Sequence, residues 1–339
     1  MNIQQAIKQV IAREDLSEAQ MHEVMTEVMT GKATDAQIGA FLVALSMKGE
    51  SVAEITAAAK VMRSLATGVQ LKKTKHLVDT CGTGGDGLGL FNVSTACAFV
   101  VAAAGGQVAK HGNRSISSKS GSADVLEAAG VNLEMSAEQI GNCVDKIGVG
   151  FMFAPAHHSA MKHAIGPRRE LAVRTIFNVL GPLTNPAGAP HQVMGVYDKN
   201  LVEPIANVLK ALGSKHVLVV HSADGLDEIS IADDTYVAEL KDGQVSTYNI
   251  NPSDFGLPLG SLEDIKAEDA ESSLILIQQA LDGVEGAAKN IIALNAGAAI
   301  YAADLTDSLQ AGVDKALSIL NSGDAHQKLD DFVRESTGC

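Results

Sequence analysis

A glycine-rich segment, DTCGTGGDG over residues 79–87, lies between a predicted strand and a predicted helix that begins with NVST at residues 92–95. Glycines let a backbone approach a ligand closely, and the first amides of a helix hold phosphate oxygens. Residues 82–87 also match the G-x-G-x-x-G pattern of dinucleotide sites. That pattern requires an acidic residue about 20 positions further on, where this sequence has none. A phosphate-binding loop is therefore favoured over a dinucleotide site, with a purely structural turn as the alternative.

A second segment, KHGNRSISSKSGS over residues 110–122, combines cationic and hydroxyl side chains. It contains Lys110, Arg114 and Lys119 with five serines and two glycines, and no acidic residue. A solvated loop usually contains acids as well. Cations and hydroxyls at this density instead favour a phosphate or pyrophosphate site.

A third segment carries His157, His158 and His163, followed by Arg168 and Arg169. The histidines lack i, i+4 spacing and no cysteine or carboxylate accompanies them, which disfavours zinc. The two arginines are predicted at the start of a helix that includes residues 171–180. There the helix dipole and the guanidinium groups would both favour a carboxylate or phosphate. A solvated helix face is the alternative for both arginines.

Two adjacent acids, Asp227 and Glu228, follow a predicted strand at residues 217–221. Active sites of open α/β sheets gather at the carboxyl ends of strands. Carboxylates are ligands that Mg²⁺ accepts while it keeps several waters. The pair is a candidate metal site, and a surface turn explains two neighbouring acids equally well.

The charge distribution supports a discrete anion site. The chain has 339 residues with 26 Lys and Arg against 40 Asp and Glu, a net charge of −14 that disfavours general nucleic-acid binding. Residues 87–123 nevertheless contain no acid and carry +3, and residues 146–197 carry +4. The length corresponds to about two domains.

The cysteines and the apolar segments indicate a cytoplasmic chain that does not bind a membrane. The spacing of Cys81, Cys97, Cys143 and Cys339 matches no metal or disulfide motif, so reduced thiols are expected. The N-terminus has no apolar core of a signal peptide. The longest apolar run, residues 96–104, is too short to span a bilayer.

The elements that must position these residues fall into two groups. Apolar periodicity and three capping boxes, Ser17 with Gln20, Thr34 with Gln37 and Ser51 with Glu54, predict four helices in the first 66 residues. From about residue 75, strands alternate with helices, which predicts a mostly parallel sheet. A hairpin at residues 237–250 makes the sheet mixed or adds an appendage. The last 65 residues are again helical.

Six blocks closely resemble the family of anthranilate phosphoribosyltransferases. They are residues 82–87, 92–95, 110–122, 153–155, 174–183 with Asn185 and Pro186, and 224–230. The resemblance implies a nucleoside phosphorylase/phosphoribosyltransferase-like α/β fold with a small N-terminal helical domain at 1–70, completed by helices near 165–185, and an α/β domain at 71–339. It also implies Mg²⁺-dependent transfer of phosphoribose from phosphoribosyl pyrophosphate to the amine of anthranilate, a step of tryptophan biosynthesis that releases pyrophosphate. The enzyme is then a pentosyl-transferring glycosyltransferase, and a homodimer through the helical domain is expected.

The resemblance also assigns residues. Those implied to bind phosphoribosyl pyrophosphate are Gly82, Gly85, Asp86, Leu90, Asn92, Val93, Ser94, Thr95, Lys110, His111, Gly112, Asn113, Arg114, Ser115, Ile116, Ser117, Ser118 and Ser122. Anthranilate would contact Gly82, Asn113 and Arg168, and two Mg²⁺ ions would contact Ser94, Asp227 and Glu228. No residue is assigned as acid or base; His111 is the one candidate.

One position departs from the family pattern. Leu90 stands where the family commonly has Ser or Thr. A hydroxyl contact to the phosphate is therefore expected to be missing or to come from Thr95.

Two rival functions stay open from the sequence. A pyrimidine nucleoside phosphorylase would also act at an anomeric carbon. A non-enzymatic relative that binds nucleic acid would need a broad basic surface.

Overall fold

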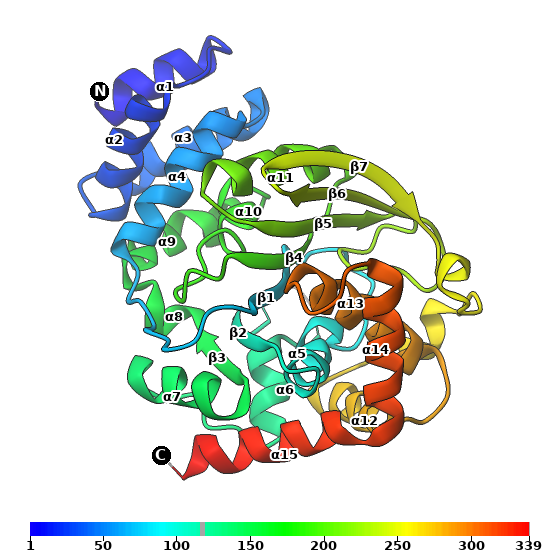
Figure 1. Ribbon diagram of the computed structural model, residues 1–339. Helices are drawn as coiled ribbons and strands as arrows, with labels where there is room; N and C mark the ends of the chain where they lie inside the picture. Colours follow the sequence, from blue (N-terminus) through cyan, green and yellow to red (C-terminus); the bar gives the residue numbers. More distant parts are fainter. Residues whose placement is uncertain (116–118, 339) are drawn as a thin grey trace.

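Four helices form the N-terminal part of the chain, here called the helical lobe: α1 Ile3–Ile11, α2 Glu18–Met29, α3 Asp35–Lys48 and α4 Val52–Leu65. The computed structural model describes residues 1–115 and 119–338. Figure 1 shows the lobe, in blue, at one end of the molecule. The three capping boxes predicted for α2, α3 and α4 are confirmed, and a further one at Asn2 and Gln5 begins α1.

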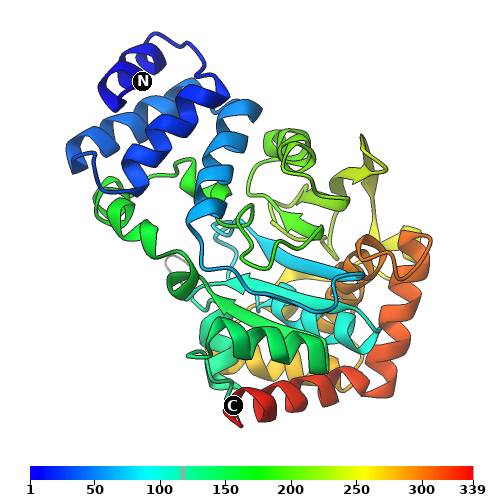
Figure 2. The ribbon, with the colours of Figure 1, turned by 60° about the vertical axis from the view of Figure 1, so that its left-hand side comes forward.

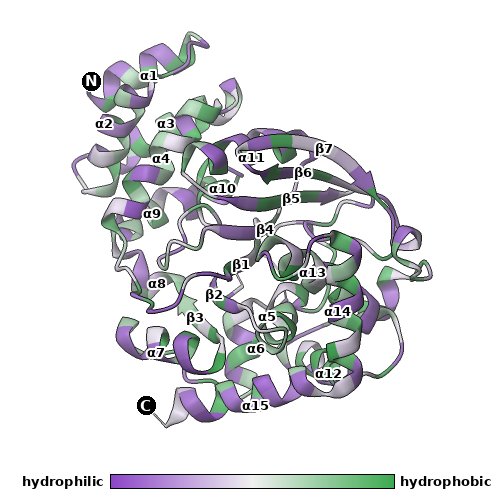
Figure 3. Cartoon of the chain, in the orientation of Figure 1, coloured by the Kyte–Doolittle hydropathy of each residue, from purple (hydrophilic) through white to green (hydrophobic). Residues whose placement is uncertain are grey.

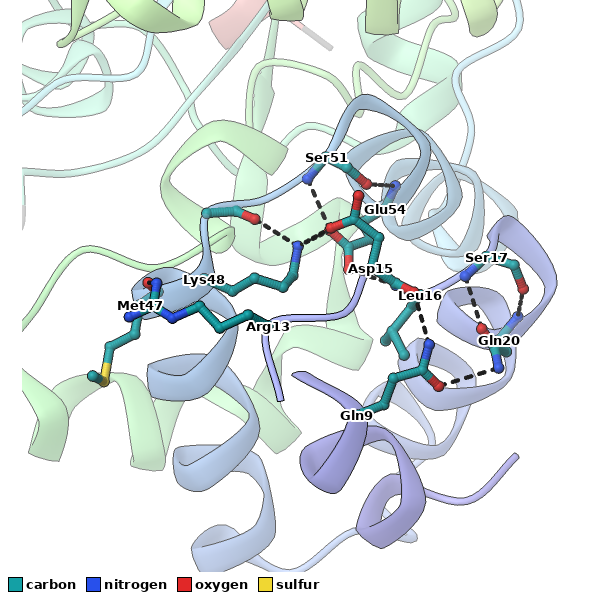
Figure 4. Close-up of polar contacts among 11 residues, drawn as sticks. Gln9, Arg13, Asp15, Leu16, Ser17, Gln20, Met47, Lys48, Ser51 and Glu54 are labelled. Atoms are coloured by element: carbon teal, nitrogen blue, oxygen red, sulfur yellow. Dashed lines mark hydrogen bonds and ion pairs between the residues drawn. The ribbon is translucent and has the colours of Figure 1, made fainter. Parts of the chain in front are cut away.

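A buried ionic cluster holds the helical lobe together (Figure 4). Lys48 Nζ at the end of α3 donates to Glu54 Oε2 at 2.8 Å and to Asp15 Oδ1 at 2.5 Å. Glu54 is fully buried, and its Oε1 accepts from the Leu16 amide at 2.9 Å. Because the second carboxylate oxygen also accepts from the Ser51 amide, one side chain connects α3, α4 and the loop before α2.

A seven-stranded sheet occupies the centre of the remaining chain. Its strands are β1 Leu77–Gly82, β2 Gln107–Gly112, β3 Val149–Phe153, β4 His191–Gly195, β5 His216–Ser222, β6 Thr235–Lys241 and β7 Gln244–Ile250. The order is β3-β2-β1-β4-β5-β6-β7, parallel from β3 to β5 and antiparallel at β6 and β7. The predicted hairpin is therefore confirmed, and the sheet is mixed. Since the strand order reverses between β1 and β4, a crevice is expected at the carboxyl ends of these two strands.

Helices cover both faces of the sheet. Two apolar clusters lie on opposite faces of the sheet, and successive residues of β5 belong to them in turn. Val217 and Val219 belong to the cluster that includes α11. Leu218 and Val220 belong to the cluster that includes α5 and α13. In Figure 3, much of β5 and β6 has the green colour of hydrophobic residues. The other helices are α5 Val93–Ala103, α6 Ser122–Ala128, α7 Ala137–Ile147, α8 Ala154–His157, α9 Lys162–Leu171, α10 Phe177–Leu180, α11 Val202–Ala211, α12 Ala270–Leu281, α13 Ala287–Ala302, α14 Leu309–Ser322 and α15 Asp324–Thr337.

The predicted helix over residues 171–180 is wrong. Helix α9 ends at Leu171, Ala172 adopts the left-handed conformation with φ of 51°, and only the short α10 follows. Pro167 lies inside α9 and is buried, so packing overrides the preference that places proline at the beginning of a helix. Arg168 and Arg169 therefore stand in the last turn of a helix. Its dipole there disfavours an anion, and the argument from a helix start does not hold.

The helical lobe shares its apolar core with later segments. Ala164 of α9 and Phe177 of α10 join the cluster formed by α1 to α4, and α9 packs against α3. The view in Figure 2 shows the green segment that includes α9 next to the lobe. We propose residues 1–70 and 71–339 as the two domains. Among the described residues, no helix has the length and apolar character needed to cross a membrane.

Candidate active site

The segment of residues 82–87, here called the glycine loop, leaves the carboxyl end of β1 and lies against the segment that follows β5. The Gly84 amide donates to Asp227 Oδ2 at 2.7 Å, and the Thr83 amide donates to the Gly195 carbonyl at the end of β4 at 3.0 Å. A Cβ at Gly195 would be 1.5 Å from the Asp227 carbonyl oxygen, so this contact requires glycine. The loops after β1, β4 and β5 thus meet at the strand reversal, where a crevice is expected.

Two adjacent carboxylates belong to this crevice. Removal from water, together with the nearby charge of Asp86, raises the pKa of Asp227 to about 6. Removal from water and the Asp227 charge also raise the pKa of Glu228, while Lys110 opposes that rise. Carboxylates that repel one another in this way fit a cation, which would neutralise them. Mg²⁺ accepts a pair of carboxylates and completes its coordination with water and ligand oxygens.

Lys110 of β2 is buried, and it contacts β1 and the start of α5. Its Nζ donates to the Thr80 carbonyl at 2.5 Å and to Ser94 Oγ at the start of α5 at 3.1 Å. An ammonium group has three N–H donors, so one remains for a ligand. Lys110 and Ser94 are therefore brought together with Glu228, whose pKa both the Lys110 charge and the Ser94 amide lower.

His111 is buried beside His158, with ring centroids 4.9 Å apart. Removal from water and the His158 ring lower the pKa of His111 to about 3. Burial and the neighbouring His157 likewise lower the pKa of His158 to about 4. Both imidazoles are neutral at neutral pH, so neither adds a positive charge for an anion, and His111 is a poor base.

The serine-rich loop, defined as residues 113–122, contacts the start of α5. Ser120 Oγ donates to Asn92 Oδ1 at 3.1 Å, and the Asn92 side chain donates back to the Ser120 carbonyl at 3.3 Å. The hydroxyl of Ser273 on α12 donates to the same Asn92 oxygen at 2.8 Å. Three sequence-predicted residues of this loop, Ile116, Ser117 and Ser118, lie outside the described residues.

The remaining predicted residues of the serine-rich loop have partners on α6 or within the loop. Arg114 pairs with Glu127 at 2.6 Å and with Asp124 at 3.3 Å. The Ser115 amide donates to Asp124 Oδ2 at 3.0 Å, and Ser122 Oγ donates to the Asn113 carbonyl at 3.4 Å. A Cβ at Gly112, the last residue of β2, would be 2.1 Å from Ser122 Oγ and 2.8 Å from the Phe151 ring, so a side chain there would displace both.

Leu90 lies between the glycine loop and α5, where it forms an isolated β-bridge with Lys266. Its partly buried side chain packs against the large apolar cluster of the α/β part. On the α5 side, Val93 and Thr95 are buried and belong to the first turn of the helix. Packing therefore explains why an apolar residue is accepted at position 90.

Arg168 stands apart from these groups. Its guanidinium carbon lies 5.2 Å from the centre of the Phe177 ring, and burial lowers its pKa. In residues 1–115 and 119–338, no carboxylate pairs with it and no hydrogen bond joins it to Gly82 or Asn113. The structure therefore leaves its charge available to an anionic ligand.

Comparison with known proteins identifies the family. Residues 4–66 match the model for the helical bundle domain of the glycosyl transferase family, and residues 74–326 match its a/b domain. A relative from Ruthia magnifica subsp. Calyptogena magnifica, named anthranilate phosphoribosyltransferase, is 76% identical over 339 residues. The match covers 100% of this chain and 100% of the relative. The chain belongs to the anthranilate phosphoribosyltransferase family.

Solved anthranilate phosphoribosyltransferases have the same fold. The enzyme from Thermus thermophilus is 43% identical with a TM-score of 0.93, covering 98% of this chain and 99% of that one. The enzyme from Saccharomyces cerevisiae, solved in complex with PRPP and Mg, is 25% identical with a TM-score of 0.89, covering 99% and 98%. The predicted family, fold class and activity are confirmed.

Several residues that contact the site had no role assigned to them from the sequence. Gly195 ends β4, Tyr197 follows it, and Arg174 donates to the Gly85 carbonyl of the glycine loop at 2.5 Å. Arg174 stood out as a cation in a basic segment and as the first residue of a block that resembles the family, but no role was assigned to it. Gly195 gave no sign at all, because its contact with Asp227 exists only once β4 and β5 are paired.

Proposed function

We infer that this chain transfers the phosphoribosyl group of phosphoribosyl pyrophosphate to the amine of anthranilate, giving N-(5-phosphoribosyl)anthranilate and pyrophosphate. The observation that carries this conclusion is the convergence of the glycine loop, the start of α5 and the Asp227–Glu228 pair at the strand reversal. A diphosphate with a divalent cation fits such a set of amides, hydroxyls and carboxylates.

The difficult step is departure of pyrophosphate from the anomeric carbon. Lys110 Nζ, fixed by Thr80 and Ser94, is placed to stabilise the negative charge that develops on the leaving group. Mg²⁺, when bound, supplies further charge neutralisation of the diphosphate. We propose two such ions, with Ser94, Asp227 and Glu228 as the protein's ligands.

Attack by the amine needs no strong base from the protein. The amine of anthranilate is neutral at neutral pH, so its lone pair is available without prior deprotonation. The C–N bond forms as the bond to pyrophosphate breaks, and the extra proton on the nitrogen then passes to the released pyrophosphate or to water. The protein's contribution is then to hold donor and acceptor in a reactive geometry, which at best supplies about 7–11 kcal/mol. The low pKa of His111 agrees with an active site without an acid–base residue.

The acceptor is proposed to bind through its carboxylate to Arg168, with Gly82 and Asn113 beside it. The half-buried guanidinium, with no carboxylate partner in the described part of the chain, supports this role. A charged hydrogen bond in a partly dry site is stronger than one in water.

One assay tests the proposed function directly. Anthranilate fluorescence should fall after phosphoribosyl pyrophosphate and Mg²⁺ are added to the enzyme, and removal of Mg²⁺ by a chelator should stop the change. Phosphorolysis of uridine or thymidine in the same preparation would instead support the phosphorylase alternative. A shift of nucleic acid in a gel at physiological salt would support the binding-protein alternative.

We further propose a cytoplasmic homodimer that forms through the helical lobe. A groove of ≈ 720 Å³ runs between α1, α3 and α9, and its lining includes Val43, Ala44 and Leu171. Ile11 and Met47, which also line it, are 67% and 66% exposed. A second copy of this apolar surface would cover them.

Ile11→Lys with Met47→Lys should convert the dimer to a monomer in light scattering, and an unchanged mass would exclude this interface.

A further inference from the structure

Arg174 joins three parts of the molecule that are distant in sequence. It belongs to the segment between α9 and α10, and its Nη2 donates to the Gly85 carbonyl of the glycine loop at 2.5 Å. Its guanidinium carbon lies 4.2 Å from the centre of the Tyr197 ring, which follows β4. Its own carbonyl accepts from Ser46 Oγ on α3 at 3.4 Å. Arg174 thus connects the helical lobe to the loop that is proposed to bind the diphosphate.

The glycine loop needs such a contact to keep one conformation. Gly84, Gly85 and Gly87 all have positive φ, at 67°, 84° and 74°. Glycine reaches these angles without strain, but it also loses the most conformational freedom when it is ordered. An external hydrogen bond to the middle of the loop therefore lowers the entropy that a ligand must remove on binding.

The hydrogen bond to Gly85 also sets the direction of the next amide. The peptide between Gly85 and Asp86 is planar and trans, so its C=O and N–H groups point to opposite sides. Because Arg174 holds the carbonyl on its own side, the Asp86 amide is directed away from Arg174. A rotation of this peptide would exchange the directions of the amide and the carbonyl, and the glycine loop would then present a different arrangement of donors and acceptors.

Tyr197 provides the aromatic ring on which the Arg174 guanidinium stacks. The Tyr197 amide donates to Thr83 Oγ1 at 3.0 Å, so the residue below the guanidinium also holds the first turn of the glycine loop. Stacking on an aromatic ring and a directed hydrogen bond are two properties that arginine has together and that lysine does not reproduce.

We propose that Arg174 is a positioning residue that fixes the glycine loop in its diphosphate-binding conformation and ties it to the helical lobe. This inference rests on the proposed function, because it assumes that the glycine loop binds phosphoribosyl pyrophosphate. Arg168 lies in the last turn of α9, shortly before Arg174, so a single stretch of chain sets both the acceptor-binding charge and the donor-binding loop.

The test compares Arg174→Ala, Arg174→Lys and the surface control Arg334→Ala with the wild type. Arg334 is exposed and pairs with Asp331 on α15, so the control removes the same charge without touching the loop. Arg174→Ala should raise the KM for phosphoribosyl pyrophosphate by about ten- to a hundredfold, while the KM for anthranilate changes less than about twofold. Arg174→Lys should recover part of the loss, and the control should match the wild type.

A second variant separates positioning from a general effect on folding. Tyr197→Leu removes the stacking surface and keeps the backbone donor to Thr83. It should raise the KM for phosphoribosyl pyrophosphate alone, and it should add little in the Arg174→Ala background because both act on the same contact. An unchanged donor KM, equal increases in both KM values, or fully additive effects of the two substitutions would each overturn the proposal. Absence of turnover in the wild type would instead refute the proposed function.

Discussion

A methyl group added to Gly82 would lie 2.3 Å from Asp227 Oδ2, closer than any real contact allows. The end of β1 and the loop after β5 therefore meet without a side chain between them. This approach lets the same carboxylate oxygen accept from the Gly84 amide while the group stays in the crevice. The close approach of Gly82 to Asp227 thus positions both the glycine loop and Asp227, the proposed metal ligand.

Gly82→Ala should displace Asp227 and lower activity. A shift of about 1 Å in a reacting group can cost about a hundredfold in rate, so kcat/KM for phosphoribosyl pyrophosphate is expected to fall by that order. Gly68→Ala serves as a control for a glycine outside the site, because a Cβ there would lie 3.6 Å or more from its neighbours. Steady-state kinetics measure both variants, and a Gly82→Ala enzyme with wild-type kcat/KM would show that this contact is unimportant.

Asp227→Asn with Glu228→Gln should remove Mg²⁺-dependent turnover. Amides keep the size of the side chains but lose the charge that a hard cation requires. Activity would be measured across a titration of Mg²⁺ from micromolar to millimolar concentrations. If the double variant kept the wild-type midpoint, these two residues would not be ligands.

The raised pKa of Asp227 predicts how stability depends on pH without Mg²⁺. Its pKa is about 6 in the folded chain against an ordinary value of 3.8, so the folded state retains a proton that the unfolded state has lost between these values. The contribution of Asp227 to the free energy of unfolding therefore falls as the pH rises through this window. Asp227→Asn should equal the wild type near pH 4 and be more stable by about 1–3 kcal/mol above pH 6.

Mg²⁺ should reverse this effect, because its ligands must be deprotonated. The increase in Tm on adding Mg²⁺ is expected to be larger at pH 8 than at pH 5 in the wild type, and small at both in Asp227→Asn. Thermal unfolding with and without Mg²⁺ provides the measurement. A larger increase at pH 5 would contradict the assignment.

Arg168→Ala should weaken anthranilate binding selectively. The KM for anthranilate is expected to rise by about ten- to a hundredfold, because the variant loses a charged hydrogen bond to the carboxylate of anthranilate. The KM for phosphoribosyl pyrophosphate should change much less. Its neighbour in the chain, Arg169, is exposed, and Arg169→Ala provides the comparison. Equal increases in both KM values would remove Arg168 from the acceptor site.

Glu54→Ala should destabilise the helical lobe. It would leave the buried Lys48 with Asp15 as its remaining carboxylate and the Leu16 and Ser51 amides without their acceptor. Breaking a buried ion pair on one side costs about 3–5 kcal/mol. Urea unfolding would show this loss, whereas Glu18→Ala, in an exposed pair with Lys60, should change stability by less than about 1 kcal/mol.

Local patterns predicted the elements well, because their causes are local. The capping boxes at Ser17, Thr34 and Ser51 need only residues three positions apart, and each is present. The order of strands and helices followed from periodicity in the same way. The glycine loop was found because its composition alone indicates close approach to a ligand.

The errors and omissions have tertiary causes. The helix expected over residues 171–180 fails because burial of Ala164 and Pro167 extends α9 across a proline, and Ala172 then ends that helix in the left-handed conformation. Likewise, nothing near Gly195 in the sequence indicates that it touches Asp227. Such contacts depend on which strands become neighbours, which a local pattern does not contain.

The shared core makes the stability of the helical lobe depend on the rest of the chain. The apolar cluster of α1 to α4 continues through Ala164, Phe177 and Leu183 to Ala206 of α11 and one face of the sheet. A fragment of only the first four helices would expose to water the apolar side chains that these later segments cover. The helical lobe is therefore expected to be less stable alone than in the whole chain.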